Sequence, residues 1–333
     1  MNVINVSQRS PEWRLWRSQG ISASEAAIIM GRSPYKTPWR LWAEKTGLVL
    51  EQPLDNNPLI RIGIEYEPQA LQCFEEKHDV LLLPLCGESE HYPLMRASFD
   101  GLSESNEPVE VKCPHESTFL DVLLNREQSL AYQLYWCQVQ QQLLVADAPR
   151  GFLFFYHQGQ EVEFEIARDE VFLTQLIASA MDFWSAVKTG QEPHKDPERD
   201  LYLPKGATEQ QWQQLAANFR QNAVKIDDLK VQLKALELQQ TGIEQTLVTL
   251  MGDYMAAEHS GLRVSRFQMQ GSIDYKAVLN AQLPELQEAA MEVYRKKSTN
   301  RVRITCRDDD GKRAEVPFDA EVLKDLARVD YWF

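Results

Sequence analysis

Residues 97–114 read ASFDGLSESNEPVEVKCP, two strand-like segments around a polar turn. Residues 103–108 are rich in turn formers, so we predict a β-hairpin with Asp100 at the end of one strand and Glu110 on its partner. Because side chains alternate along a strand, Glu110 and Lys112 share one face and the valines share the other. Two carboxylates and an ammonium group should therefore meet at one place, where the like charges are costly unless a cation lies between them.

The composition is that of a globular chain with a sizeable core. Of 333 residues, 44% are hydrophobic, and this length suggests two domains or one large domain with an appendage. No apolar run approaches about 18 residues and the N-terminus lacks a signal pattern, so we expect a cytoplasmic protein without a membrane partner. Five cysteines without CxxC spacing favour reduced thiols over a zinc site. The net charge of −14 argues against coating nucleic acid by charge alone, but not against a few placed cations.

Hydrophobic periodicity and turn formers predict a mixed α/β domain at the N-terminal side. Helices are expected at 58–79, 127–145 and 169–188, and strands at about 80–85, 92–100, 108–113, 151–157 and 161–167. Prolines and charges between residues 190 and 207 indicate a boundary. We therefore predict a first domain over residues 1–195.

The remainder of the chain has a different pattern. Apolar residues recur in steps of three and four from Trp212 to Tyr254, as in a heptad seam. Because Thr241-Gly242 offers a turn, we predict a linker and a helical hairpin over 196–258, with an oligomeric coiled coil as the alternative. Residues 259–333 are expected to form a small basic α/β module. It would either contact DNA phosphates or present a solvated charged hairpin.

Three further stretches add polar residues in a recognisable order. They are WRLWRSQGISASE (13–25) with Arg17, Ser22 and Ser24, GIEYEPQA (63–70) with Glu67, and AYQLYWCQVQQ (131–141) with Gln138. Together with Asp100 and Glu-Val-Lys, these motifs resemble the lambda-type exonucleases, the YqaJ viral recombinase family of the PD-(D/E)XK nuclease superfamily. The similarity runs from about Trp13 to residue 190.

The resemblance implies a restriction-endonuclease-like core, with a central mixed sheet flanked by helices. It also implies a 5′→3′ exonuclease that acts on double-stranded DNA ends with Mg²⁺, for which Mn²⁺ can substitute. Such enzymes form a ring-shaped homotrimer and leave 3′ overhangs for a single-strand annealing protein in phage or mobile-element recombination. Two alternatives stay open: an endonuclease or single-strand-specific nuclease on the same fold, and a non-catalytic recombination scaffold.

The resemblance further assigns roles to individual residues. Metal binding would fall to Asp100, Glu110, Glu67 and the backbone carbonyl of Val111, catalysis also to Lys112 and Gln138, and the 5′-phosphate to Arg17, Ser24 and Ser98. The chain departs from the family at Thr118, where the lambda enzyme has an arginine, and Arg126 or Arg32 could replace that cation. Phe99-Asp100 stands where the motif has Pro-Asp. Gln140 and Gln141, beside the assigned glutamine, are expected to face solvent.

Overall fold

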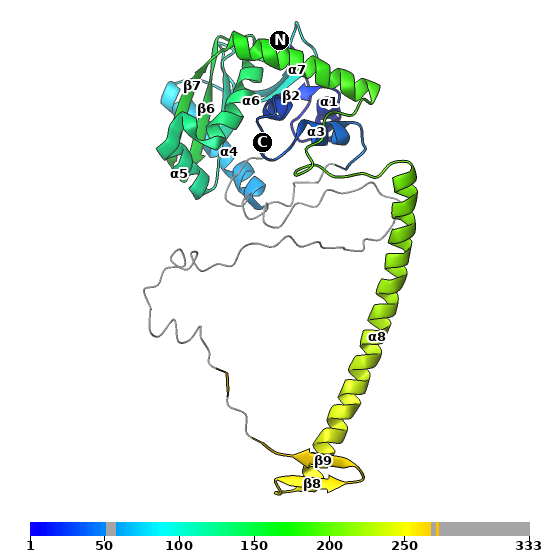
Figure 1. Ribbon diagram of the computed structural model, residues 1–333. Coiled ribbons are helices and arrows are strands. Elements are labelled where there is room, and N and C mark those ends of the chain that lie inside the picture. Colours follow the sequence, from blue (N-terminus) through cyan, green and yellow to red (C-terminus); the bar gives the residue numbers. More distant parts are fainter. Residues whose placement is uncertain (51–57, 268–270, 273–333) are drawn as a thin grey trace. The chain divides into compact units, whose positions relative to one another are not determined.

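The computed structural model describes residues 1–50, 58–267 and 271–272 (Figure 1). The chain divides into two units, one taking in Met1–Tyr202 and the other beginning at Leu203. Among the described helices, none combines the length and apolar character needed to cross a membrane.

A seven-stranded mixed sheet forms the centre of the first unit. Its strands are β1 (Asn2–Ile4), β2 (Ile21–Ser22), β3 (Leu83–Glu88), β4 (Met95–Leu102), β5 (Pro108–Lys112), β6 (Arg150–His157) and β7 (Gln160–Ala167). The order is β1-β3-β4-β5-β6-β7, and β2 pairs with β4. Strands β5 and β6 are parallel, so a crossover must join them. The helices between them provide it, and the expected fold class, a central mixed sheet flanked by helices, is confirmed.

Several helices of this unit begin at residues whose side chains cap them. Its helices are α1 (Pro11–Ser18), α2 (Ala26–Ile29), α3 (Pro38–Lys45), α4 (Pro58–His78), α5 (Glu116–Asn125), α6 (Leu130–Ala146) and α7 (Glu170–Thr189), with short 3₁₀ turns at η1 (Ala23–Glu25) and η2 (Arg126–Gln128). Side chains of Ser10, Ser129 and Asp169 accept hydrogen bonds from the first turns of α1, α6 and α7. These caps set where the helices start and therefore which side chains reach the sheet.

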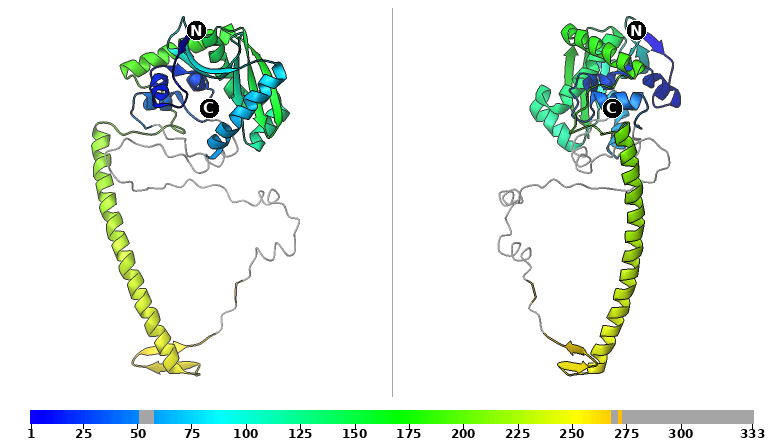
Figure 2. Two further views of the ribbon diagram at one scale, coloured as in Figure 1. Left: turned by 180° about the vertical axis from the view of Figure 1, so that it is seen from behind. Right: turned by 45° about the vertical axis from the view of Figure 1, so that its right-hand side comes forward.

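Strand β5 is buried on both faces because a helix covers each one. On one face, Val109 and Val111 pack against Phe74 of α4, which lies across the sheet (Figure 2). On the other face, α6 covers Glu110 and Lys112. A strand that alternates apolar and charged residues is thus completely buried. Its charged face is satisfied by the ion pair between Glu110 and Lys112 and by partners that α6 supplies.

In the second unit, the predicted helical hairpin is wrong. Helix α8 (Ala207–Met251) runs for 45 residues without a break, and Gly242 lies inside it (Figure 1). One glycine destabilises a helix by about 1 kcal/mol, and a helix of this length tolerates that cost. The Thr241 hydroxyl donates to the Glu237 carbonyl within the helix. A short hairpin of β8 (Ala256–His259) and β9 (Leu262–Ser265) follows. The predicted basic module falls mostly at 268–270 and 273–333, outside the described residues.

Candidate active site

The predicted hairpin of β4 and β5 is confirmed, and it positions the first carboxylate. The strands pair antiparallel, with Gly101 opposite Val109. Phe99 is completely buried on one face of β4, so Ser98 and Asp100 both point to the other face. The Val111 backbone N–H donates to the Asp100 carboxylate at 3.0 Å, which fixes that side chain against β5.

A buried ion pair lies next to this carboxylate. Glu110 is 2% exposed, and the Lys112 ammonium, itself on a 7% exposed residue, lies 2.5 Å from its Oε1 atom. Helix α6 completes the shell: the Gln138 amide donates to the same oxygen at 2.6 Å, and the Gln142 amide donates to Oε2. The Lys112 ammonium also lies 4.5 Å from the Tyr135 ring centroid. Both charges are therefore satisfied by protein groups.

Asp100 is electrostatically less well compensated than Glu110. Burial and then the charge of Glu110 raise the pKa of Asp100 well above its usual range, and Glu67 adds to the effect. Lys112 and the Val111 N–H lower the pKa of Asp100, but they do not cancel the increase. Like charges held together in this way favour a cation beside Asp100.

A second polar group, with its own cation, lies at the end of α1. Arg17 donates to Ser24 Oγ at 2.8 Å and to Ser22 Oγ at 3.0 Å, and its guanidinium lies 4.5 Å from the Trp13 ring centroid. Trp13 and Arg17 are four residues apart on the helix and so share a face. The Trp13 indole N–H donates to Ser98 Oγ at 2.8 Å, linking this group to β4.

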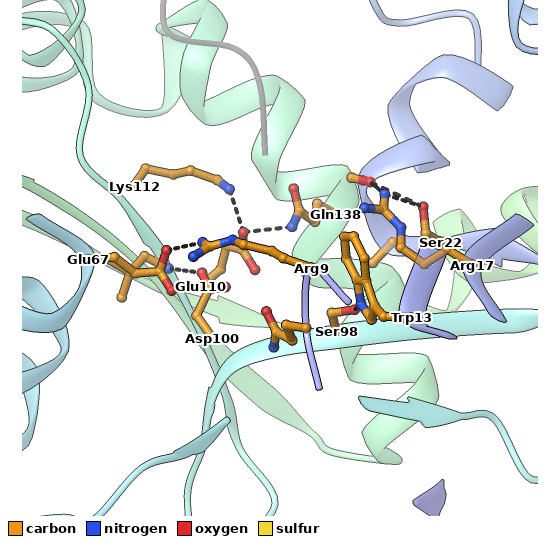
Figure 3. A pocket seen from close by; sticks show the side chains of 14 residues that line it. Arg9, Trp13, Arg17, Ser22, Glu67, Ser98, Asp100, Glu110, Lys112 and Gln138 are labelled. Carbon is orange, nitrogen blue, oxygen red and sulfur yellow. Dashed lines mark hydrogen bonds and ion pairs between the residues drawn. The ribbon is translucent and has the colours of Figure 1, made fainter. Parts of the chain in front are cut away.

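A third cation reaches the carboxylates from the segment that precedes α1. The Arg9 guanidinium lies 2.6 Å from Glu67 Oε2, and the neighbouring Gln8 amide donates to the Phe99 carbonyl at 2.9 Å. This pair places Glu67 of α4 beside the two β-strand carboxylates (Figure 3).

All nine predicted site residues line one open cleft. Its lining consists of Gln8, Arg9, Trp13, Arg17, Ser22, Ala23, Ser24, Glu67, Ser98, Asp100, Glu110, Val111, Lys112 and Gln138. In Figure 3, the Arg17–serine group lies to one side and the carboxylates with Lys112 to the other. The structure thus brings together motifs that are up to 125 residues apart, from Trp13 to Gln138.

The cations suggested as replacements at Thr118 do not reach this cleft. Arg126 lies over the Phe164 ring at 4.4 Å, and Arg32 lies over the Phe172 ring at 5.0 Å. Thr118 itself is buried in α5. Besides Lys112, Arg9 also reaches the carboxylates, and the sequence reasoning missed it.

The other residue that was missed is Gln142, and its signal was present in the sequence. It lies one helical turn beyond Gln138, on the same face of α6. The expectation that Gln140 and Gln141 face solvent is wrong. Both are fully buried, donating to the carbonyls of Ala167 and of Ile21 respectively.

The donors in the cleft fit a divalent cation of the Mg²⁺ type in kind. Such ions prefer oxygen ligands, and Asp100, Glu110 and the Val111 carbonyl supply them. In the described part of the chain, however, no three His, Cys, Asp or Glu side chains are grouped so that they could hold a metal ion. Two of the carboxylates are instead engaged by protein groups: Arg9 pairs with Glu67, while Lys112 and two glutamines bind Glu110. The raised pKa of Asp100 nevertheless indicates that a positive charge would be favoured there.

Comparison with known proteins supports one family. Residues 12–149 match the model of the YqaJ-like viral recombinase domain. The uncharacterized protein YqaJ of Bacillus subtilis (strain 168) is 25% identical over 203 residues, which are 58% of this chain and 61% of that relative. This chain therefore matches less than two thirds of the relative's length.

Two solved structures are also similar. One is the alkaline exonuclease LHK-Exo from Laribacter hongkongensis, at 20% identity and a TM-score of 0.49, covering 54% of this chain and 94% of that chain. The other is a phage-related exonuclease from Haemophilus somnus 129PT, at 13% identity and a TM-score of 0.41, covering 51% and 96%. Residues 12–149 are thus similar to the YqaJ-like viral recombinase domain, and this similarity takes in the residues that line the cleft from Trp13 to Gln138.

Proposed function

We propose that the first unit is a Mg²⁺-dependent exonuclease that digests linear double-stranded DNA in the 5′→3′ direction. One observation carries this proposal: a single cleft joins the Asp100–Glu110–Lys112 cluster to the Arg17–serine group. The first set has the groups that phosphodiester hydrolysis requires, and the second has the groups that bind a terminal phosphate.

The Arg17 end of the cleft accounts for end recognition. A 5′-phosphate is a dianion, and a guanidinium beside two hydroxyls offers it several charge-assisted hydrogen bonds. Arg17, Ser22 and Ser24 are already held together by mutual hydrogen bonds, so they need little rearrangement to bind it. Ser98, fixed by Trp13, lies between this group and Asp100 on β4.

The carboxylate end accounts for hydrolysis. Water must attack phosphorus while the bond to the 3′-oxygen breaks, so negative charge grows on the phosphate oxygens. Mg²⁺ held by Asp100, Glu110 and the Val111 carbonyl would supply Lewis-acid stabilisation of that charge. Lys112 balances charge and orients the attacking water, and Gln138 keeps Glu110 in place. Loss of one of these carboxylates should slow hydrolysis on the order of 10³-fold or more.

The assembly and the biological role extend the same proposal. We take the enzyme to act as a homotrimeric ring in the cytoplasm, leaving 3′ overhangs for a single-strand annealing protein in phage or mobile-element recombination. The basic stretch within residues 260–313, with eleven Lys and Arg against seven Asp and Glu, would add sequence-independent phosphate contacts.

The test compares linear duplexes that carry 5′-phosphate or 5′-hydroxyl ends, with and without Mg²⁺. The proposal predicts faster digestion from 5′-phosphate ends and no digestion without the cation. Closed circular duplex should resist, because it has no end. Equal cutting of circular and linear duplex would instead support an endonuclease on this fold.

A further inference from the structure

Arg9 adopts a backbone conformation that arginine disfavours. Its φ angle is +68°, in the left-handed region that is costly for residues with a Cβ atom. The turn around it is anchored on both sides: Gln8 binds the Phe99 carbonyl, and Ser10 caps α1 through the Trp13 N–H at 3.1 Å. Strained residues that persist in an otherwise well-anchored segment tend to mark functional sites.

The strained turn places the long cationic side chain of Arg9 in the cleft. From the segment that precedes α1, Arg9 extends toward Glu67 across the carboxylate side of the cleft (Figure 3). The Arg9 side chain is 44% exposed and that of Glu67 is 26% exposed. An ion pair this accessible to water contributes little to stability, so it does not by itself explain why arginine occupies a position suited to glycine.

The charges in the cleft suggest what else Arg9 does. Lys112 is paired with Glu110, and Arg17 is bonded to serines at the other end. A phosphate placed over Asp100 and Glu110 would meet negative charge on the protein side, and Arg9 is the exposed cation beside them. Because guanidinium binds phosphate and carboxylate in the same forked geometry, Arg9 can exchange Glu67 for a phosphate.

We propose that Arg9 is a substrate-binding residue that leaves Glu67 to bind the DNA phosphate presented to Asp100 and Glu110. This inference rests on the proposed nuclease function and deepens it. The exchange has a second effect, since it releases the Glu67 carboxylate at the moment when DNA occupies the cleft. Arg9 therefore couples DNA binding to the availability of the third carboxylate.

Two substitutions separate the charge from the strain. Arg9→Gly removes both, because glycine adopts positive φ without cost, whereas Arg9→Ala removes the charge and keeps the strain. The matched control is Arg126→Gly, at another arginine with positive φ (+50°), which lies over Phe164 outside the cleft. Binding of the full-length protein to a 5′-phosphorylated duplex is measured in EDTA by fluorescence anisotropy at several salt concentrations, together with Tm.

We expect Arg9→Gly and Arg9→Ala to weaken DNA binding equally, by about tenfold, and to lower the salt slope by about one. The Tm of Arg9→Gly should equal or exceed that of wild type and should be higher than the Tm of Arg9→Ala. The control Arg126→Gly should leave the DNA affinity unchanged. Unchanged affinity and slope in both Arg9 variants, with a lower Tm, would overturn the inference and leave a structural ion pair. If the wild-type protein itself neither binds nor digests duplex DNA, the proposed function fails, and this result is distinct from the first.

Discussion

Replacing Lys112 by methionine tests whether the buried ion pair holds the cleft together. Met has a similar length but no charge, so Lys112→Met leaves the Glu110 carboxylate, 2% exposed, without its ammonium partner at 2.5 Å. Removing one member of a buried pair typically costs about 3–5 kcal/mol. Gln138 and Gln142 continue to donate to Glu110, so we expect the lower end, about 3 kcal/mol of unfolding free energy.

The companion variant removes both charges. In Lys112→Met with Glu110→Gln, no buried charge is left unpaired, and we expect a loss of about 1 kcal/mol or less. Urea unfolding of the full chain, followed by the fluorescence of the buried tryptophans of the first unit, measures both variants. A loss below about 1 kcal/mol in the single variant, or a double variant as unstable as the single one, would refute the reasoning. Both variants should be inactive, so stability is the informative quantity.

Three further predictions follow from individual contacts. The pKa of Asp100 is raised in the folded chain, so the folded chain holds this proton to higher pH than the unfolded chain does. The stability of the wild-type protein therefore falls as the pH rises from the unfolded-state pKa to the folded-state pKa of Asp100. In thermal scans, Asp100→Asn should have a higher Tm than wild type at pH 8, and this difference should disappear near pH 4. Arg17→Ala should lower the rate on 5′-phosphoryl ends by about 10²-fold and abolish the preference over 5′-hydroxyl ends in a digestion assay, whereas a retained preference would contradict the assignment. The heptad seam of α8 predicts pairing with the same helix of a second copy, so Leu229→Asp combined with Leu236→Asp should lower the mass measured by light scattering. The control Val231→Asp, at a residue that is somewhat more exposed and lies off the seam, should leave the mass unchanged.

Local pattern was sufficient for the hairpin that carries the carboxylates. Alternation and turn formers placed Asp100 and Glu110 on paired strands, and the structure has them there. The same reasoning could not find Arg9, because its partner Glu67 is 58 residues away and the strained turn leaves no periodic signal. Family resemblance did not help either, since it showed only that the family arginine is missing at Thr118, and the replacements that we suggested, Arg126 and Arg32, lie elsewhere.

Two other errors have a common physical cause, which is tertiary context. Gln140 and Gln141 were expected in solvent because glutamine is polar, but α6 is surrounded by protein, and both amides are satisfied by backbone carbonyls. In α8, the predicted turn at Thr241-Gly242 followed local propensity, and the helix continues through it. Periodicity thus identified the apolar seam of α8 but not that the helix continues through Gly242.

The most direct test of the account uses a linear duplex with a 5′-phosphate on one strand and a 5′-hydroxyl on the other. Each strand carries a different internal label, and the wild-type protein is compared with Asp100→Ala in the presence of Mg²⁺. We predict that the wild-type protein removes the 5′-phosphorylated strand and leaves the other strand intact, while Asp100→Ala digests neither. Digestion that starts from 3′ ends, or an Asp100→Ala variant that retains the wild-type rate, would contradict the claim that this cleft is a metal-dependent 5′→3′ exonuclease site.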